Sequence, residues 1–256
     1  MIWHITGDTH GRFGRFDEYR FEEPEKHAVI ILGDAGFNYY LNKTDKKNKK
    51  IVNNYGFKVY CVRGNHEERP EKVPGIHPFY DEEVGGIVLK EIKYPNIRYF
   101  IDGETYTIQG YRFLVIGGAY SVDKNYRLQN GYGWFKDEQL NESERDAILK
   151  KTKGKAYDFV LSHTCPISWE PTDLFLNCVD QKTVDKSMEL WLDEVKNNIT
   201  FKVWLFGHYH ADRLERPGVE MFYLDTEELV NIIERWFSGK AIDWWLEKSP
   251  NYYMGV

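Results

Sequence analysis

Five of the eight histidines in the 256-residue sequence lie in short polar motifs. They are His10 in GDTHG, His66 in RGNHE, His163 in LSHT, and His208 and His210 in GHYH. These motifs and a further one, GDAG, also carry Asp8, Asp34 and Asn65. Imidazole, carboxylate and amide ligands without a thiolate favour a site for Mn, Fe, Co, Ni or Zn. Two such ions bridged by one carboxylate would polarise a phosphoryl oxygen and activate water, which is a route to phosphoester hydrolysis.

Each motif follows a run of apolar, β-branched or aromatic residues that predicts a buried strand. The runs cover residues 1–6, 27–32, 57–62, 111–116, 157–161 and 202–206. In layered α/β proteins, loops at the carboxyl ends of strands assemble sites from residues that are distant in sequence. We therefore expect the motif side chains to converge at one edge of a sheet.

The segments between the predicted strands complete an α/β pattern. Helical periodicity predicts helices over 136–151, 184–195 and 226–238, the last with Leu229, Ile232, Ile233 and Trp236 as its apolar side. Alternation over 104–118, with a turn at Gln109 and Gly110, predicts a hairpin and hence a mixed sheet.

The composition indicates one folded domain over residues 1–256, because 42% of residues are hydrophobic and no linker-like stretch divides the chain. A net charge of −6 gives no general attraction to nucleic acid or anionic membrane. The sequence has no run long enough to span a bilayer, and residues 1–10 lack the basic start and apolar stretch typical of a signal peptide. Three cysteines without CxxC spacing fit a reducing compartment. We therefore expect a cytoplasmic protein that does not bind membranes.

The ordered series GDTHG, GDAG, GNHE, SHT and GHYH resembles the calcineurin-like metallophosphoesterase superfamily over residues 7–210. This resemblance implies two mixed β-sheets packed as a sandwich and flanked by helices, a four-layer α/β fold. It also implies a dinuclear metal centre at one edge, with Mn as the first expectation and Fe, Zn, Co or Ni as alternatives. Residues 226–256 are expected to form a helical, aromatic extension packed on this domain.

The resemblance also implies a role for each motif residue. The first ion would be bound by Asp8, His10 and His210, the second by Asn65, His163 and His208, and Asp34 would bridge the two ions. A metal-bridging hydroxide would attack phosphorus, and His66 would either protonate the leaving alkoxide or steady the phosphate. We expect Arg63 and Asn65 to stabilise the developing charge.

Two departures from the superfamily pattern bear on the substrate. The RGNHE motif, with Arg63 and Glu67, resembles the phosphoprotein phosphatases and favours monoesters. The Asp-Arg-Gly that follows the second motif of those phosphatases is absent, since Phe37 and Asn38 stand there. The aspartate that orients the catalytic histidine is therefore missing, and protein-phosphatase activity is less favoured. Lys124 and Arg127, in the run after residue 117, are candidates to contact the substrate phosphate.

The sequence thus predicts a phosphomonoesterase that acts on a phosphorylated small molecule or a phosphoprotein. A phosphodiesterase or nuclease remains an alternative; it would use the lysines of KTDKKNKK, residues 43–50, although a solvated helix face is the favoured interpretation of that stretch. A metal-bound scaffold without activity is the third possibility. The sequence does not decide the oligomeric state.

Some chemically suggestive residues have simpler explanations. His4, His27 and His77 have no motif partners, and we expect ordinary surface or hydrogen-bonded histidines. Cys165 is expected to be a buried filler, because no separate base is available to activate its thiol.

Overall fold

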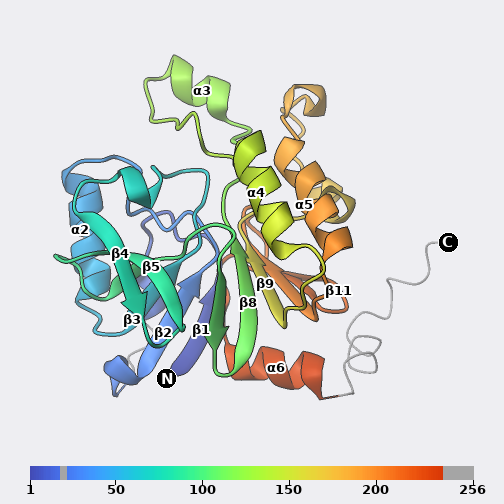
Figure 1. Cartoon of the computed structure of the whole chain (residues 1–256). Helices are drawn as coiled ribbons and strands as arrows, with labels where there is room; N and C mark the ends of the chain where they lie inside the picture. The colour runs from blue at the N-terminus through green and yellow to red at the C-terminus, as the bar shows by residue number, and fades with distance from the viewer. Residues whose placement is uncertain (18–21, 239–256) are drawn as a thin grey trace.

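The computed structural model describes residues 1–17 and 22–238. Two mixed β-sheets pack face to face, with helices on both outer sides (Figure 1). The first sheet has the order β13 (Thr226–Glu228), β1 (Ile2–Thr6), β2 (His27–Ile31), β3 (Lys58–Cys61), β6 (Ile97–Tyr99), β5 (Gly86–Glu91) and β4 (Ile76–Asp81). The second has the order β11 (Arg213–Arg216), β12 (Val219–Met221), β10 (Val203–Phe206), β9 (Phe159–Ser162), β8 (Tyr111–Ile116) and β7 (Thr105–Ile108).

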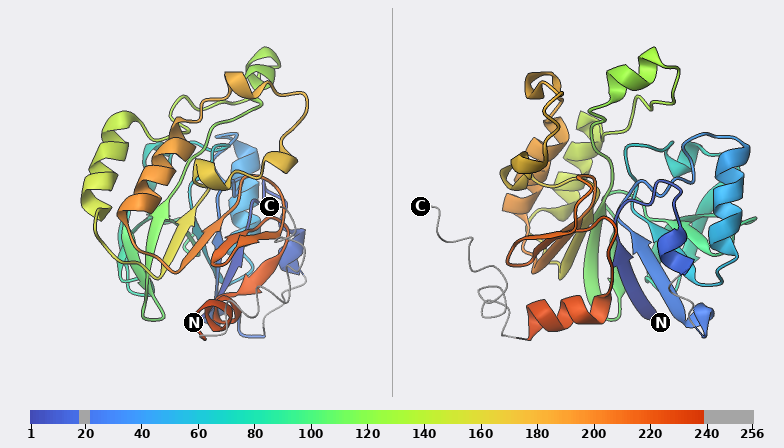
Figure 2. Two further views of the ribbon diagram at one scale, coloured as in Figure 1. Left: turned by 90° about the vertical axis from the view of Figure 1, so that its right-hand side faces the viewer. Right: turned by 180° about the vertical axis from the view of Figure 1, so that it is seen from behind.

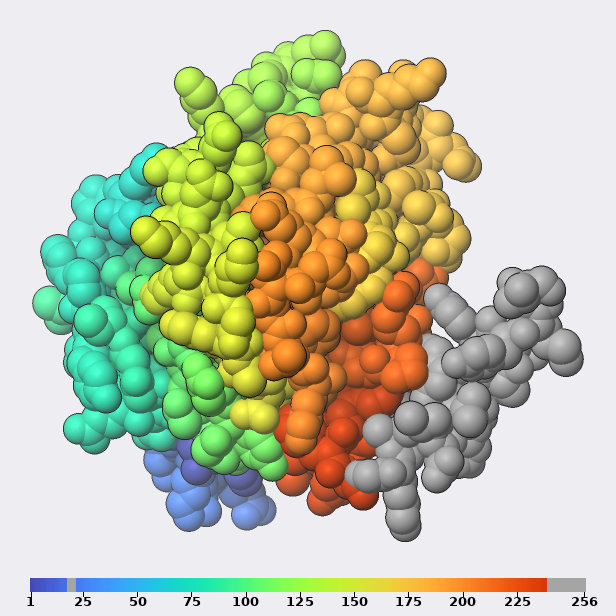
Figure 3. Space-filling model, turned by 45° about the vertical axis from the view of Figure 1, so that its right-hand side comes forward, coloured from blue at the N-terminus to red at the C-terminus, as the bar shows by residue number. Residues whose placement is uncertain are grey.

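Alternation along the central strands builds the layers, because successive side chains in a strand point to opposite faces. Ala28 and Ile30 of β2 face the second sheet, whereas Val29 and Ile31 pack on the outer side with Val52. The outer layers are α2 (Lys43–Asn53) on the first sheet, and α4 (Glu142–Thr152) and α5 (Ser187–Asn198) on the second. The expected four-layer fold is confirmed. Figure 3 shows α4 and α5 side by side on the surface of the molecule.

The parallel strands place the motifs together. In the first sheet β1, β2 and β3 are parallel neighbours, and in the second β8, β9 and β10 are. All six strands predicted from apolar runs are present, and a motif follows each of five of them. The loop that carries α3 (Lys124–Gln129) and the segment after β9 lie at one end of the molecule, with α6 (Leu229–Phe237) at the other (Figure 2).

The predicted hairpin is confirmed, and the φ angles of its two turn residues explain how the chain reverses there. Strands β7 and β8 pair antiparallel, with Ile108 opposite Tyr111. Gln109 and Gly110 both have positive φ, at 52° and 84°, as a two-residue type I′ turn requires.

Three helix predictions need correction at their first residues. Helix α4 begins at Glu142, because the Asn141 side chain accepts from the Glu144 backbone N–H and the Glu144 side chain accepts from the Asn141 backbone N–H. Helix α5 begins at Ser187, after Val184. Residues 226–228 form β13, which pairs antiparallel with β1, so the C-terminal helix begins only at Leu229.

The remainder of α6 behaves as predicted. Leu229, Ile232 and Trp236 are buried in the core between the sheets, and Ile233 packs against it. Residues 226–238 therefore contribute a strand to the first sheet and a helix packed on the core, whereas the rest of the expected extension, residues 239–256, lies outside the described residues. A short helix, α1 (Gly14–Asp17), follows the first motif. Within the described part of the chain, no helix has the length and apolar character needed to cross a membrane.

Candidate metal centre

The first group of predicted ligands meets at one point. The Nε2 atoms of His10 and His210 lie 3.7 Å and 3.3 Å from Asp8 Oδ2. The same two nitrogens are 2.9 Å apart. These three ligand atoms are close enough together to bind one metal ion.

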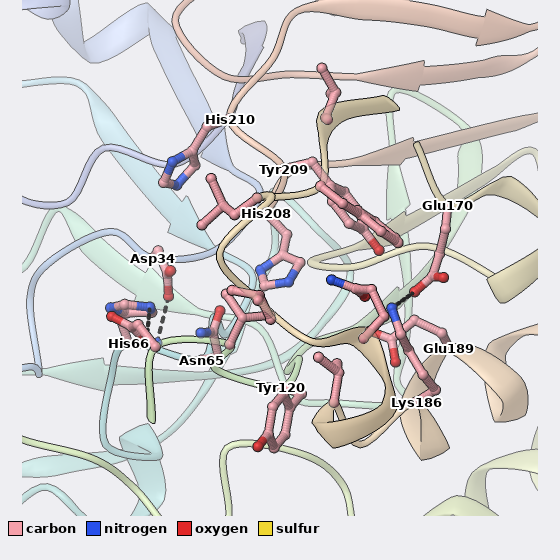
Figure 4. Close-up of a pocket in the computed structure, with 18 residues that line it drawn as sticks. Asp34, Asn65, His66, Tyr120, Glu170, Lys186, Glu189, His208, Tyr209 and His210 are labelled. Atoms are coloured by element: carbon pink, nitrogen blue, oxygen red, sulfur yellow. Dashed lines mark hydrogen bonds and ion pairs between the residues drawn. The ribbon is translucent and has the colours of Figure 1, made fainter. Parts of the chain in front are cut away.

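The second group of predicted ligands lies next to the first, and Asp34 is close to both groups. His163 Nε2 is 2.8 Å from Asn65 Oδ1 and 3.6 Å from Asp34 Oδ2. The same Asp34 oxygen is 3.9 Å from His10 Nε2. The His208 ring lies 5.0 Å from the His163 ring, centroid to centroid. Figure 4 shows Asp34, Asn65 and the GHYH histidines around one hollow. The Asp34 carboxylate thus stands between the two groups.

The hydrogen bonding of these residues fits cations. Asp8 Oδ2 is buried and has no hydrogen-bond partner among the described residues. His163 Nδ1 lies 2.8 Å from the Leu32 carbonyl, so this nitrogen carries the proton. In the neutral ring the Nε2 lone pair then faces the oxygens of Asn65 and Asp34, which are acceptors as well. A metal ion is the group that converts such facing lone pairs into ligands.

The electrostatics of the site favour positive charge. Burial alone would raise the pKa of Asp34, but the charges of His66 and His163 hold that pKa well below its usual range. Burial likewise opposes the ionisation of Asp8, yet the neighbouring His163 and His210 lower its pKa. Two ionised, fully buried carboxylates need compensating cations.

The histidines respond to burial and to these carboxylates. Burial lowers the pKa of His208 to about 3, with the charge of His163 acting in the same direction. Burial also opposes the charge on His163, but Asp34 and Asp8 raise its pKa to about 9. At neutral pH His208 is therefore neutral and ready to bind a metal, whereas His163 takes a proton where a cation would otherwise bind.

Backbone turns bring the ligands back over the strand ends. Positive φ angles occur at His10 (46°), Asp34 (49°), His208 (71°) and His210 (55°). Non-glycine residues seldom adopt this conformation, and it is concentrated at functional sites. The left-handed conformation of both GHYH histidines lets side chains two residues apart approach the centre from different directions.

The motif glycines make room for the ligands. A Cβ at Gly64 would lie 1.9 Å from Asp34 Oδ1, and one at Gly207 would lie 2.4 Å from Asp8 Oδ1. Neither glycine has a positive φ, so at both positions the lack of a Cβ is what the site requires. Gly33 does have a positive φ, at 103°.

Polar contacts fix the amide of Asn65. Its Nδ2 donates to Ser121 Oγ at 2.8 Å, and Ser121 donates in turn to Glu138 Oε2 at 2.6 Å. The amide oxygen is thereby turned toward His163 and the metal centre. The sequence offered no signal for Ser121 or Glu138, because neither lies in a motif.

His66 lies beside both groups. One of its ring nitrogens is within 4.8 Å of ligand atoms of His10 and Asp34. Its backbone N–H donates to Asp34 Oδ1 at 2.8 Å, which fixes this carboxylate. Burial lowers the pKa of His66, although Asp34 acts against this. Its Nε2 is 3.9 Å from Asp123 Oδ1, an acidic partner that sequence reasoning missed.

Arg127 lies buried behind this pair. One of its nitrogens, Nη1, donates to Ser121 Oγ at 3.1 Å and lies 3.8 Å from Asp123 Oδ1. Its Nε and Nη2 have no hydrogen-bond partner among the described residues. Its guanidinium carbon is 5.1 Å from the centroid of the Tyr39 ring. A positive charge is thus held close to His66 and Asp123.

The structure does not bring Arg63 into the site. Its guanidinium donates to Asp102 at 2.8 Å, to the Glu138 carbonyl at 2.7 Å and to the Gly117 carbonyl at 3.2 Å. Only 3% of the residue is exposed, and it borders a different cavity. These contacts tie the RGNHE loop to the loops after β6 and β8. The expected direct contact of Arg63 with the phosphate therefore has no geometric support.

The other candidates also lie away from the ligands. Lys124 Nζ sits 4.0 Å from the Trp134 ring centroid. Of the lysines in 43–50, Lys49 is buried in an ion pair with Glu91 and the others are exposed on α2. Cys165 is fully buried, and burial raises its pKa well above the usual value. This fits a filler.

The histidines outside the motifs are surface or hydrogen-bonded residues, as expected. His4 Nε2 and His27 Nδ1 lie 3.0 Å apart in a hydrogen-bonded pair, and His77 is exposed on β4. Neither arrangement involves the metal centre.

Solved structures align with most of the chain at low sequence identity. Phosphopantetheinyl hydrolase from Mycobacterium tuberculosis aligns over 91% of this chain and 92% of its own, with 14% identity and a TM-score of 0.45. A protein of unknown function from Aquifex aeolicus aligns over 91% and 98%, with 13% identity and a TM-score of 0.38. At these identities the alignments say nothing about the substrate. Among curated proteins, no sequence matches this chain.

A comparison of the sequence with models of protein families identifies the family of the chain. The model of the calcineurin-like phosphoesterase family matches residues 2–212, which include every predicted metal ligand. Such a match fits the two-sheet fold and the His/Asp groups at its edge. The chain therefore belongs to the calcineurin-like phosphoesterase family and is a metal-dependent phosphoesterase.

Proposed function

We propose that the protein is a phosphomonoesterase with a dinuclear metal centre. The observation that carries this proposal is the buried Asp34 carboxylate, with one oxygen 3.6 Å from His163 and 3.9 Å from His10. Asp8, His10 and His210 would hold one ion, and Asn65, His163 and His208 the other, with Asp34 between them. The ligand types suit Mn, Fe, Co, Ni or Zn, and we take Mn²⁺ as the first expectation.

The metal ions, when bound, supply a nucleophile at neutral pH and positive charge at the phosphoryl oxygens. The chain supplies the proton for the leaving oxygen. We assign this role to His66, whose ring borders the hollow beside the ligands. The neutral ring of the free protein would gain a proton when a phosphate dianion lies next to it, because an adjacent negative charge raises the pKa of histidine.

Asp123 is proposed to orient His66 in place of the missing aspartate after the second motif. It faces His66 Nε2 from the loop after β8, and Arg127 holds both Asp123 and Ser121. Arg127 is thus a positioning residue that also adds positive charge near the phosphate. Arg63 is likewise proposed to act through the loop that carries Asn65 and His66. For Lys124 the structure offers no contact that supports a role in substrate binding.

Monoester preference is the first test of this proposal. With Mn²⁺ present, we expect faster turnover of 4-nitrophenyl phosphate than of bis(4-nitrophenyl) phosphate, because His66 and the two ions together accommodate a dianion. Chelation should abolish both activities, and added Mn²⁺ should restore them. Faster diester turnover would contradict the monoester assignment and make nucleic acids or cyclic nucleotides the next substrates.

A substitution of Asp123 tests its positioning role. We expect Asp123→Asn to lower kcat for methyl phosphate by about 10- to 100-fold, within the range for general acid catalysis, with little change in KM. The effect on 4-nitrophenyl phosphate should be several-fold smaller, because nitrophenolate leaves without a proton. Asp146→Asn, on the exposed side of α4, is the matched control. Equal losses with both substrates would show that Asp123 merely supports the loop.

The alternatives make separate predictions. A nuclease that uses the exposed lysines Lys43, Lys46, Lys47 and Lys50 would lose salt-dependent nucleic-acid cleavage on charge reversal there. A scaffold would hold two ions and hydrolyse no phosphoester. We expect a phosphorylated small molecule or a phosphoprotein as substrate. The cytoplasm, proposed on the grounds of composition, is the expected location.

A further inference from the structure

A cavity of about 320 Å³ opens directly beside the metal centre. One end is formed by ligand residues that include Asn65 and His208, together with the catalytic candidate His66. The other end is formed by the segment between β9 and α5 and by the loop after β8 (Figure 4). A phosphate bound at the metals would therefore direct its ester group into this cavity.

The walls of the cavity are mainly apolar. They are formed by Tyr120, Val122, Leu174, Phe175, Leu176, Val179 and Val184. Phe175 stacks with Tyr209, 6.4 Å between centroids, and Lys186 Nζ lies 4.5 Å from the Phe175 ring centroid. Tyr209 lies between the two histidines of GHYH, so this wall is attached to the loop that carries metal ligands.

The cavity also contains hydrogen-bond acceptors that are not used. Glu189 is only 3% exposed; its Oε1 accepts from Thr164, and its Oε2 has no partner among the described residues. The buried Oε1 of Gln181 also lacks a partner there. The nearby Glu170 is already paired with Lys186 at 2.7 Å. Unpaired buried acceptors are costly, and a ligand that donates to them is strongly favoured over one that does not.

From these observations we propose that the cavity binds the alcohol part of a small phosphomonoester, largely apolar and ending in an O–H or N–H donor. This inference rests on the proposed phosphomonoesterase function and specifies its substrate class. The volume lies at the lower end of the range for small-molecule sites, about 300 to 1,000 Å³. Glu189 receives the donor, the apolar walls bury the body, and the metal centre holds the phosphate.

Burial raises the pKa of Glu189 to about 7, against a hydrogen bond from its own backbone and one from Thr164. The group therefore carries less than a full negative charge near neutral pH. A hydroxyl or amide N–H that donates to Oε2 would satisfy the ionised form without bringing a second charge into the cavity.

Phosphonates that are not hydrolysed test the cavity separately from catalysis. We expect the Mn²⁺-loaded protein to bind hexylphosphonate about 30-fold more tightly than methylphosphonate in calorimetry, because several methylene groups leave water. The 6-hydroxyhexyl compound should bind more tightly still. Val184→Trp should remove the advantage of the hexyl group, and Glu189→Leu only that of the hydroxyl. Neither variant should change methylphosphonate binding more than twofold. Lys182→Ala, beside the cavity but not lining it, is the control.

The outcomes separate this inference from the proposed function. Equal binding of the three phosphonates, together with turnover of 4-nitrophenyl phosphate, would overturn the cavity assignment and leave the phosphomonoesterase in place. Chain-length preference that depends on Val184, without turnover of any phosphoester, would support the cavity and contradict the enzymatic function. Preference for a phosphoserine peptide over 6-hydroxyhexyl phosphate in kcat/KM would overturn the small-molecule class.

Discussion

Replacing Asp34 by asparagine is expected to reduce kcat for 4-nitrophenyl phosphate by at least about 1000-fold, a loss of ~4 kcal/mol in transition-state stabilisation. In the structure the Oδ1 of Asp34 accepts from the His66 backbone N–H, which asparagine can also satisfy. The amide N–H2 would then take the place of Oδ2, between His10 and His163. A donor group in that place cannot bind a cation, so both metal positions lose their shared ligand. Steady-state kinetics over a range of Mn²⁺ concentrations measures this effect.

A stability measurement distinguishes this loss from misfolding. Without metal, Asp34 and Asp8 are buried carboxylates that repel each other. Attraction to the neighbouring histidines outweighs this repulsion, since the pKa of Asp34 lies well below its usual range, so Asp34→Asn should lower the melting temperature in chelator while the protein still unfolds cooperatively. Addition of Mn²⁺ should raise the melting temperature of the wild-type protein more than that of Asp34→Asn, because ligands stabilise the state that binds them. Activity of the variant within tenfold of wild type would rule out a bridging carboxylate.

The His66→Gln variant is expected to show the second-largest effect, and one that depends on the leaving group. For methyl phosphate, we expect kcat to fall by about 100- to 10,000-fold, the usual contribution of a positioned general acid. For 4-nitrophenyl phosphate the loss should stay below about tenfold, because nitrophenolate is stable without a proton. The backbone N–H that holds Asp34 is retained in this variant.

The matched control is His77→Gln, a histidine exposed on β4 and remote from the site. It should leave kcat for both substrates within twofold of wild type. A uniform loss with both substrates in His66→Gln would assign His66 to phosphate binding. It would thereby remove the general-acid role from the mechanism.

The metal centre was largely predictable because its residues are local to strand ends. Strong apolar runs determined six strands, and their parallel pairing brings the motif side chains together at one edge. Of the residues in the ligand sets implied by the family resemblance, the structure groups Asp8 with His10 and His210, and Asp34 with Asp8 and His163. The first residues of the helices were less predictable. A capping residue such as Asn141 decides where a helix begins through its hydrogen bonds, and the apolar pattern does not record those bonds.

The residues around the ligands were not predictable, for a physical reason. Asp123, Ser121 and Glu138 act through long-range contacts that no periodicity or motif records. Arg63 was placed on the substrate because of its motif, but Asp102 and two carbonyl groups account for its charge and donors. Short edge strands such as β13 were missed because their pairing is decided by the partner strand.

The central claim is that one carboxylate, Asp34, joins two metal ions. Electron paramagnetic resonance of the wild-type protein loaded with Mn²⁺ tests it most directly, alongside metal analysis of the same sample. We expect two Mn²⁺ ions per chain and a spectrum of an exchange-coupled pair, which Asp34→Asn should convert to the signal of isolated Mn²⁺. One ion per chain, or two ions without coupling in the wild-type protein, would contradict the account.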